Sequence, residues 1–384
     1  MVQPSVAQTA ASSLAAEQSN RGVITVAQLA AEPRQVVKDL AQRGISFQGL
    51  FVQDWSKGAR AGVDAAEGFG RYSFDLTASF DNEKLLGWKG SSASMRLKQH
   101  IGEFGEGYQD AAQVISNIDA PSRTSLYELW LQQRLLEDRV RLKVGKIDAN
   151  SEFAAVGNAG DFLNSSMGFS PTILAFPSYP EPKFGVNVFL VPRKNYGLGT
   201  GVFQTAGSGV LTLVEPSRKW NVSTNELDGH VNVGYWRLDG TLSRFDGGQS
   251  SVSQGVYAVA EQALWKHALD RGGERRLATF FQVGTADRHV SPVTSHVGVG
   301  MVLQAPIAER PADSFGFAAT GVGFSPHPAA GFDDASEIIL ETYYRASVTR
   351  HVALVQDFQF VRNPGGLESN PDCVVITPRL VVSF

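Results

Sequence analysis

Polar and apolar side chains alternate along much of this chain, most regularly between residues 71 and 81. Because successive side chains of a β-strand point to opposite faces, such alternation predicts a strand with one apolar and one polar face. The pattern holds for eleven residues, whereas a membrane-spanning strand needs about 9–11 and a typical soluble strand has about 5–6. The apolar members are Tyr72, Phe74, Leu76, Ala78 and Phe80, and the polar ones are Arg71, Ser73, Asp75, Thr77, Ser79 and Asp81.

The same pattern, weaker in places, recurs often enough to predict sixteen strands. A closed up-and-down barrel with both ends on one side requires an even number. The predicted fold is therefore all-β, a transmembrane antiparallel up-and-down β-barrel of about 16 strands. The predicted strands are residues 45–54, 70–81, 91–102, 124–135, 138–147, 183–192, 196–205, 228–238, 240–246, 254–266, 276–286, 295–305, 314–324, 335–347, 350–362 and 373–384.

Loop lengths provide an independent test, since such barrels have short turns at one rim and long loops at the other. If the first strand runs outward, four of the seven inner turns are short and the three longest connections fall at the outer rim. The inner connections 267–275 and 306–313 are longer than this rule prefers. The short inner turns are Glu137-Asp138, Arg193-Lys194-Asn195, Asp239-Gly240 and Thr349-Arg350, and the long outer loops are residues 103–123, 148–182 and 206–227.

The orientation of the predicted strands follows from residues 138–147, in which one face is basic. Turning that face toward lipid would cost roughly 2–4 kcal/mol per cation near the midplane. Three cations together would rival the stability of a typical domain, about 5–15 kcal/mol. The basic face therefore faces the lumen and the apolar face the lipid. The basic face carries Arg139, Arg141 and Lys143, and the apolar face carries Val140, Leu142 and Val144.

A large soluble β-sandwich or a propeller also shows alternation. A sandwich would have strands of about 6 residues and two apolar inner faces, and a propeller would show a repeat of about 40 residues, which this sequence lacks. Both alternatives are less favoured than the barrel.

Composition narrows the class of protein further. Only 19% of residues are charged, and no run of about 18 apolar residues predicts a membrane helix. A net charge of -4 gives no reason to expect a nucleic-acid partner. The single Cys373 excludes an internal disulfide and a multi-thiolate metal site, and the seven His show no ligand spacing. No metal site and no cofactor are predicted.

Residues 1–44 are predicted to be an N-terminal tether with a short helix, and residues 45–384 the barrel. Apolar residues after Pro33 recur at helical spacing up to Gly44. The small residues Ser5 to Ala10 are typical of the end of a signal peptide, although no intact signal peptide precedes them. We hypothesise that Met1 is a misassigned or engineered start.

Enzyme signatures are absent from the sequence: it contains no Gly-x-Ser-x-Gly, His-Glu-x-x-His, P-loop or paired-Cys motif. Ser295 and His296 are adjacent and so are expected on opposite strand faces. The protein is not expected to be an enzyme.

The lumenal faces of three consecutive predicted strands place cations around an acid and an aromatic ring. Such a wall suits a neutral polyol, because Arg and Glu can hydrogen-bond vicinal hydroxyl groups and Trp can stack on a C–H face. The alternative is that these charges only keep a wide lumen hydrated. The predicted substrate-binding residues are Arg96, Lys98, Glu128, Trp130, Arg141 and Lys143, with His100, Gln132 and Arg139 on the same faces.

Residues 148–182 form a 35-residue connection without evident regular structure, and connections of that length are usually functional. The segment Gly160 to Gly168 is small and apolar enough to fold into a lumen. It is predicted to narrow the pore, with Asp161, Phe162 and Asn164 as the constriction residues. An outward cap packed on neighbouring loops is the alternative.

From about Val37 to Phe384 the chain resembles the carbohydrate-selective porins of the OprB type. The resemblance implies a sixteen-stranded outer-membrane barrel that passes monosaccharides, often glucose, by passive diffusion. A general or structural porin without a sugar site is the alternative, followed by a barrel-bound binding protein whose loops block the lumen. The matching segments are residues 40–45, 160–164, 176–180, 184–186, Glu341-Thr342-Tyr343-Tyr344-Arg345, 363–366 and 379–384.

The C-terminal strand carries a related resemblance, because it ends on Phe384 as the terminal strands of bacterial outer-membrane barrels end on an aromatic residue. The resemblance implies location in a Gram-negative outer membrane, contact with its lipid, and recognition of Phe384 by the barrel-assembly machinery. A small-molecule sugar is the expected solute.

Overall fold

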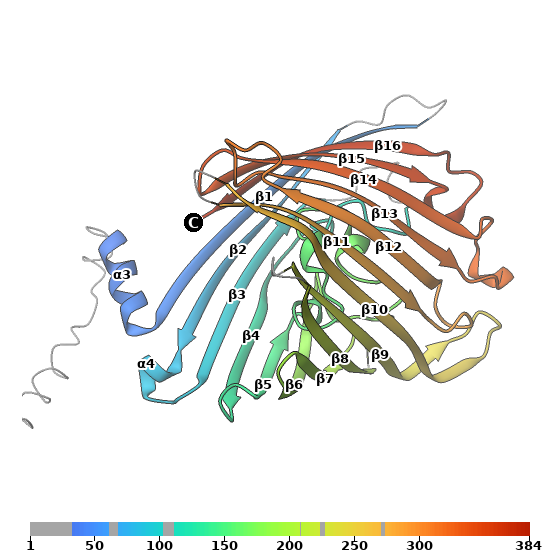
Figure 1. The fold of residues 1–384 in the computed structure, drawn as a ribbon. Coiled ribbons are helices and arrows are strands. Elements are labelled where there is room, and N and C mark those ends of the chain that lie inside the picture. Colours follow the sequence, from blue (N-terminus) through green and yellow to red (C-terminus); the bar gives the residue numbers. More distant parts are fainter. Residues whose placement is uncertain (1–32, 61–67, 103–110, 208, 223–226, 270–272) are drawn as a thin grey trace, which may run out of the picture.

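A computed structural model describes residues 33–60, 68–102, 111–207, 209–222, 227–269 and 273–384. Within them, sixteen antiparallel strands form a closed barrel in which each pairs with the next and β1 pairs with β16 (Figure 1). This confirms the predicted fold. The strands are β1 (Ile45–Arg60), β2 (Phe69–Asp81), β3 (Ser91–Ile101), β4 (Arg123–Leu135), β5 (Val140–Ile147), β6 (Lys183–Arg193), β7 (Tyr196–Gln204), β8 (Val210–Val222), β9 (Leu227–Ser243), β10 (Gln249–Ala268), β11 (Glu274–Thr285), β12 (Val293–Gln304), β13 (Ser314–Phe324), β14 (Ser336–Ser347), β15 (Val352–Arg362) and β16 (Cys373–Ser383).

The helices are short and lie in the segments that precede or connect the strands. Helix α3 (Pro33–Arg43) ends at Gly44, whose φ of +100° suits glycine, and it lies outside the ring beside the start of β1 (Figure 1). No helix among the described residues is long and apolar enough to span a membrane. The others are α4 (Asn82–Leu86), η1 (Ala149–Ser151), η2 (Gly157–Ala159), α5 (Ser165–Gly168), η3 (Pro328–Ala330) and η4 (Pro364–Gly366).

Residues 1–32 lie outside the described part of the chain. The hypotheses about Met1 and about the segment from Ser5 to Ala10 concern that part. The division of the chain at residue 44 therefore stays a prediction, although β1 begins at Ile45.

The alternation seen in the sequence separates the two faces of the wall. In β16, Val374 and Ile376 are 41% and 43% exposed on the outer surface, whereas Thr377 is fully buried and Arg379 is 7% exposed on the inner face. An apolar outer surface and a polar inner one are what a barrel in lipid requires.

Two of the strand predictions between residues 206 and 246 were wrong. One strand was missed and another was divided into two, so the predicted total of sixteen was unchanged. The expected outer loop 206–227 contains strand β8, and the expected strands 228–238 and 240–246 are one strand, β9. The predicted turn Asp239-Gly240 lies within β9, where Asp239 pairs with Val252 of β10 and Val210 of β8.

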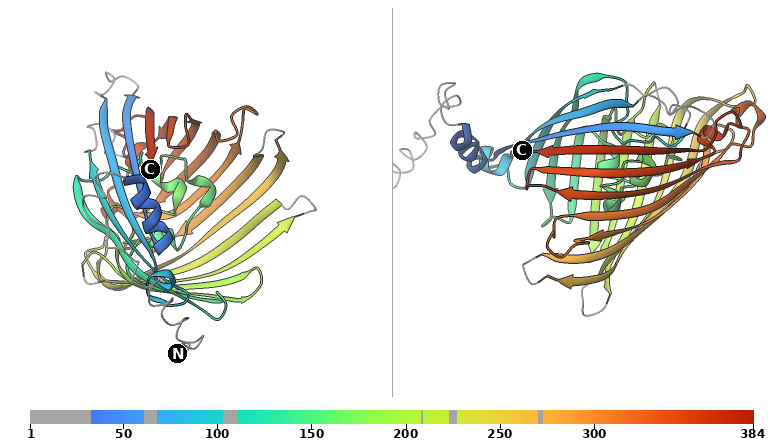
Figure 2. Two further views of the ribbon diagram at one scale, coloured as in Figure 1. Left: turned by 90° about the vertical axis from the view of Figure 1, so that its left-hand side faces the viewer. Right: turned by 90° about the horizontal axis from the view of Figure 1, so that it is seen from above.

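The connection between β5 and β6, residues 148–182, folds inside the ring; we call it the β5–β6 loop. Figure 2 (left) views the ring from the α3 end and shows this green segment in its interior. Its apolar side chains pack against inward side chains from one half of the wall. Loop residues Phe153, Phe162, Leu163 and Met167 pack with wall residues Leu211, Leu213, Trp236, Leu238, Tyr257, Val259, Phe280 and Val302.

This packing explains why β8 escaped the sequence pattern. Leu211 and Leu213 point inward and are fully buried against the loop, while Val210 and Val214 point outward. The strand is therefore apolar on both faces. A rule that expects a polar inner face fails where a loop fills the lumen.

The β3–β4 loop, of which residues 111–122 are described, is joined to the β5–β6 loop. The Asn117 amide donates to the Leu163 carbonyl (2.7 Å), and the Ser165 amide donates to the Val114 carbonyl (3.0 Å). The Asn117 side chain also donates to the Phe162 carbonyl (3.2 Å). The two loops therefore form one packed unit within the barrel.

Candidate functional site

A cavity of about 600 Å³ lies between the paired loops and the barrel wall. Its wall residues come from β1 to β4 and β14 to β16. Carboxylates, cations and phenol rings line it. Its polar and aromatic lining includes Ser73, Asp75, Arg96, Lys98, Asn117, Asp119, Tyr127, Asp148, Asp161, Tyr179, Arg345 and Arg379.

Two of the predicted substrate-binding residues, Arg96 and Lys98, line this cavity from β3. Arg96 forms an ion pair with Glu128 of β4 (3.4 Å), and Lys98 forms one with Asp75 of β2 (3.1 Å). The Arg96 side chain is 37% exposed, and that of Lys98 is 11% exposed. Arg96 is therefore the more accessible of the two to a solute.

Aromatic rings lie beside these cations. The Lys98 ammonium is 4.8 Å from the centre of the Tyr127 ring and 5.0 Å from that of Tyr179. The Arg96 guanidinium is 5.7 Å from the Tyr127 ring. The site thus combines hydrogen-bonding groups with apolar ring faces.

Tyr127 was missed because strict alternation would place it on the outer face. The ladder between β3 and β4 shifts by one residue, so that Arg96 pairs with Glu128 but Leu97 pairs with Leu126. Such a bulge lets Tyr127 and Glu128 both point inward, and both are buried. The Tyr127 hydroxyl donates to Asp148 of the β5–β6 loop.

The other predicted residues lie in a separate group, where Glu152 of the β5–β6 loop pairs with both β5 cations. Arg141 lies 2.6 Å from Glu152, and Lys143 forms an ion pair with the same carboxylate. Lys143 also lies 4.1 Å from the centre of the Trp130 ring. Trp130 lines a second cavity, of about 560 Å³, together with residues at the start of β1 and in α4. Arg139, expected within the strand, lies in the exposed turn before β5.

The three predicted constriction residues differ in exposure. The Asp161 side chain is 35% exposed, forms an ion pair with Arg345 of β14 (3.4 Å) and accepts a hydrogen bond from Ser314 (2.8 Å). Phe162 is 1% exposed, and its ring centre lies 4.8 Å from that of Tyr343. Asn164, also 1% exposed, accepts a hydrogen bond from Ser166 at the start of α5. Asp161 therefore presents the polar edge of the loop to the cavity, while Phe162 and Asn164 hold the loop in place.

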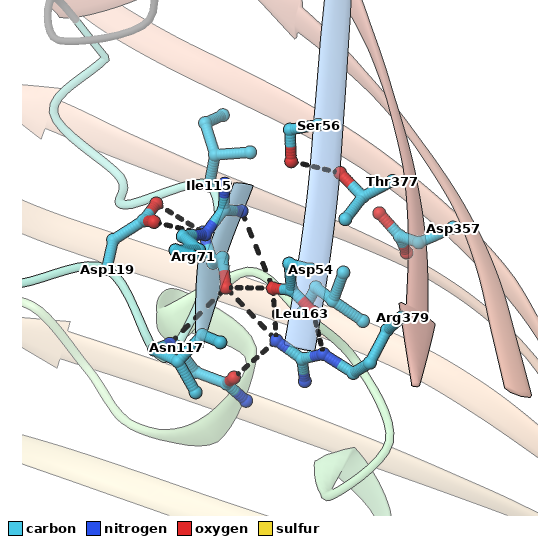
Figure 3. A network of polar contacts seen from close by, with 12 residues as sticks. Asp54, Ser56, Arg71, Ile115, Asn117, Asp119, Leu163, Asp357, Thr377 and Arg379 are labelled. Atoms are coloured by element: carbon cyan, nitrogen blue, oxygen red, sulfur yellow. Dashed lines mark hydrogen bonds and ion pairs between the residues drawn. The ribbon is translucent and has the colours of Figure 1, made fainter. Parts of the chain in front are cut away.

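The β3–β4 loop is fixed to the wall by a buried network (Figure 3). Arg379 of β16 donates to both carboxylate oxygens of Asp54 (2.6 and 2.8 Å) and to the Asn117 side chain (2.9 Å). Arg71 of β2 pairs with Asp54 (3.5 Å) and with Asp119 of the loop. Burial raises the pKa of Asp119 to about 6, and Arg71 counteracts that rise. These contacts place the loop at the seam where β1 meets β16.

Metal binding and catalysis by a Ser–His pair would each require a particular group of side chains. The described residues contain no group of three or more His, Cys, Asp or Glu side chains arranged to hold a metal ion. His296 faces Ser170 (3.1 Å) and Thr320 (2.8 Å) but is 1% exposed. The hydrogen bond between His296 of β12 and Ser170 of the β5–β6 loop is therefore buried and joins the loop to the wall.

Comparisons with known proteins agree with this architecture. The family profile described as "Carbohydrate-selective porin, OprB family" matches residues 70–384. A relative, Porin B of Pseudomonas aeruginosa, is 22% identical over 408 residues, which cover 90% of this chain and 89% of the relative. The high-pH structure of Pseudomonas putida OprB is 18% identical and has a TM-score of 0.81, covering 90% of this chain and 96% of its own. The low-pH structure of Pseudomonas putida OprB is also 18% identical, has a TM-score of 0.60 and covers 92% and 97%.

Proposed function

This chain belongs to the OprB family of carbohydrate-selective porins, and we propose that monosaccharides such as glucose cross it past the side chains of Arg96, Lys98 and Glu128. It is a porin of the Gram-negative outer membrane. Transport by such a channel is passive diffusion, and the proposal assigns no catalytic step to any residue.

The observation that carries the proposal is the charge arrangement around the larger cavity. Opposite charges face each other between neighbouring strands, as in Arg96–Glu128 and Lys98–Asp75, and between the β5–β6 loop and β14, as in Asp161–Arg345. Such a lining offers many donors and acceptors to a neutral polyol without a large net field. The exposed face of a tyrosine ring can contact the C–H groups of a sugar, and here the partly exposed Tyr179 lies beside Lys98.

Weak binding is what a channel requires, because a solute held tightly cannot leave. Hydrogen bonds to charged groups contribute about 1.5–3 kcal/mol when dry, and competing water reduces this. Loss of one cation is therefore expected to change sugar selectivity by about tenfold or less. Arg141, Lys143 and Trp130 are proposed as contacts at the separate group on β4 and β5, where Glu152 pairs with both cations.

Liposome swelling tests this function directly. The wild-type channel is expected to admit glucose faster than amino acids of similar size, and Arg96→Gln to reduce that preference because one exposed donor group is lost. Arg244→Gln is the matched control, since Arg244 pairs with Asp246 in the connection between β9 and β10 and does not line the cavity. Equal entry of both solutes in the wild type would favour a general porin, and no entry would favour a binding protein with a blocked lumen.

We also propose that the outer face contacts lipid and that the barrel-assembly machinery recognises Phe384. Phe384 pairs with Gly49 through two backbone hydrogen bonds (2.8 and 3.0 Å), and its ring is 62% exposed, 6.2 Å from the ring centre of Phe74. A side chain at Gly49 would collide with that ring. The terminal residue thus closes the barrel and remains accessible.

Phe384→Ala is expected to lower the amount of folded protein in the outer membrane, because the machinery would lose its aromatic signal. Heat-modifiable mobility on gels would measure folded barrel. Phe358→Ala removes an equally apolar outer-face ring away from the terminus, 43% exposed, and serves as the control. Equal amounts of folded protein in both variants would contradict the recognition of Phe384.

A further inference from the structure

Strand β14 contacts both loops through its inward side chains, and two of these are buried carboxylates. Glu337 is fully buried and Glu341 is 1% exposed, at one end and the middle of the inward row. Tyr343 and Arg345 continue that row toward the cavity. The segment from Glu341 to Arg345 belongs to the family resemblance, but the proposed sugar site uses only Arg345.

Glu337 binds the start of the described part of the β3–β4 loop. Its carboxylate accepts hydrogen bonds from the backbone amides of Ala112 and Gln113, both at 2.8 Å. The Gly365 amide donates to the same group at 2.7 Å. Two successive amides that converge on one anion form a compact anion-binding arrangement.

Glu341 repeats the arrangement with the β5–β6 loop. Its carboxylate accepts hydrogen bonds from the amides of Leu163 (2.5 Å) and Asn164 (3.3 Å). Those two residues immediately precede α5 and follow Asp161 and Phe162. Buried amides need partners, and the two oxygens of Glu341 are the acceptors for these two amides.

The two loops that border the cavity are therefore both held by β14. The β3–β4 loop carries Asn117 and Asp119, and the β5–β6 loop carries Asp161. Arg345, further along β14, pairs with Asp161. The same strand therefore holds the two loop backbones and supplies a charged partner at the passage itself.

We propose that Glu337 and Glu341 are positioning residues that set the cross-section of the sugar passage by holding the two loops through their backbone amides. This inference rests on the proposed function in assuming that the cavity is part of the conducting path. It does not depend on which solute the channel prefers.

Single-channel recording in potassium chloride tests the role of Glu341. The wild type is expected to show one stable conductance level. Glu341→Ala removes both acceptor oxygens from the amides of Leu163 and Asn164, so the segment at Leu163 is expected to move and the single level to be lost to fluctuating lower levels. Glu309→Ala, at an exposed position in the connection after β12, should keep the wild-type trace.

Glu341→Asp provides a second variant that keeps the carboxyl group, so that folding is less affected, but shortens the reach to both amides. Fluctuating levels are expected again. A stable wild-type level in folded Glu341→Asp or Glu341→Ala protein, judged by heat-modifiable mobility, would overturn the proposal. Failure of the sugar function would show instead as equal swelling rates in the wild type, which leaves this recording unaffected.

Discussion

Deletion of residues 158–168 is expected to raise the single-channel conductance several-fold. The deleted segment includes η2 in part, the Asp161 edge of the cavity and α5, and it fills the lumen beside β10 to β14. Removing it leaves a wider water-filled path, and ion flow increases with the cross-section of a pore. Planar-bilayer recording in potassium chloride would measure the change.

The same deletion should lower stability, because Val259, Phe280 and Val302 lose the apolar partners that cover them. Exposed apolar surface costs about 25 cal/mol per Å². A deletion of residues 327–331, in the exposed connection after β13, is the control for shortening a loop. Unchanged conductance in folded deletion protein would disprove the constriction.

Asp54→Ala is expected to destabilise the barrel by about 3–5 kcal/mol, the cost of breaking a buried ion pair from one side. Asp54 is fully buried and pairs with Arg71 and Arg379, which are 1% and 7% exposed. The variant would leave two guanidinium groups close together without their shared counter-charge (Figure 3). Urea unfolding in detergent would measure the loss.

Asp246→Ala is the matched control, because Asp246 pairs with Arg244 in the exposed connection between β9 and β10. Solvent-exposed pairs contribute little to stability, so this variant should unfold like the wild type. If Asp54→Ala unfolds at the same urea concentration as Asp246→Ala, the network does not fix the β3–β4 loop to the seam.

Alternation predicted the barrel because lipid outside and water inside impose opposite demands on neighbouring side chains. The pattern was sufficient for β2 and β16, where polar residues face the interior. It failed at β8, whose inner leucines meet the β5–β6 loop instead of water. A single sequence does not show which part of the lumen a loop will fill. The error at β9 has a different origin, because Asp239-Gly240 is a dipeptide typical of tight turns but lies within the strand.

The site was harder to predict than the fold. Strand spacing placed Arg96, Lys98 and Glu128 on the inner face, where the structure also has them. It could not anticipate the bulge that turns Tyr127 inward, and it could not pair Asp161 with Arg345, which are far apart in the chain. Glu152, which pairs with both Arg141 and Lys143, comes from the loop and has no signal in strand periodicity.

The central claim is that the open passage follows one wall of the barrel while the β5–β6 loop seals the other. Cysteine accessibility tests it most directly, in a Cys373→Ser background with a charged, membrane-impermeant thiol reagent. Lys98→Cys, in the cavity, should react and lower the current, whereas Val302→Cys, on the same inner face but 3% exposed behind the loop, should not. Equal reaction at both positions, or reaction at Val302→Cys alone, would contradict the account.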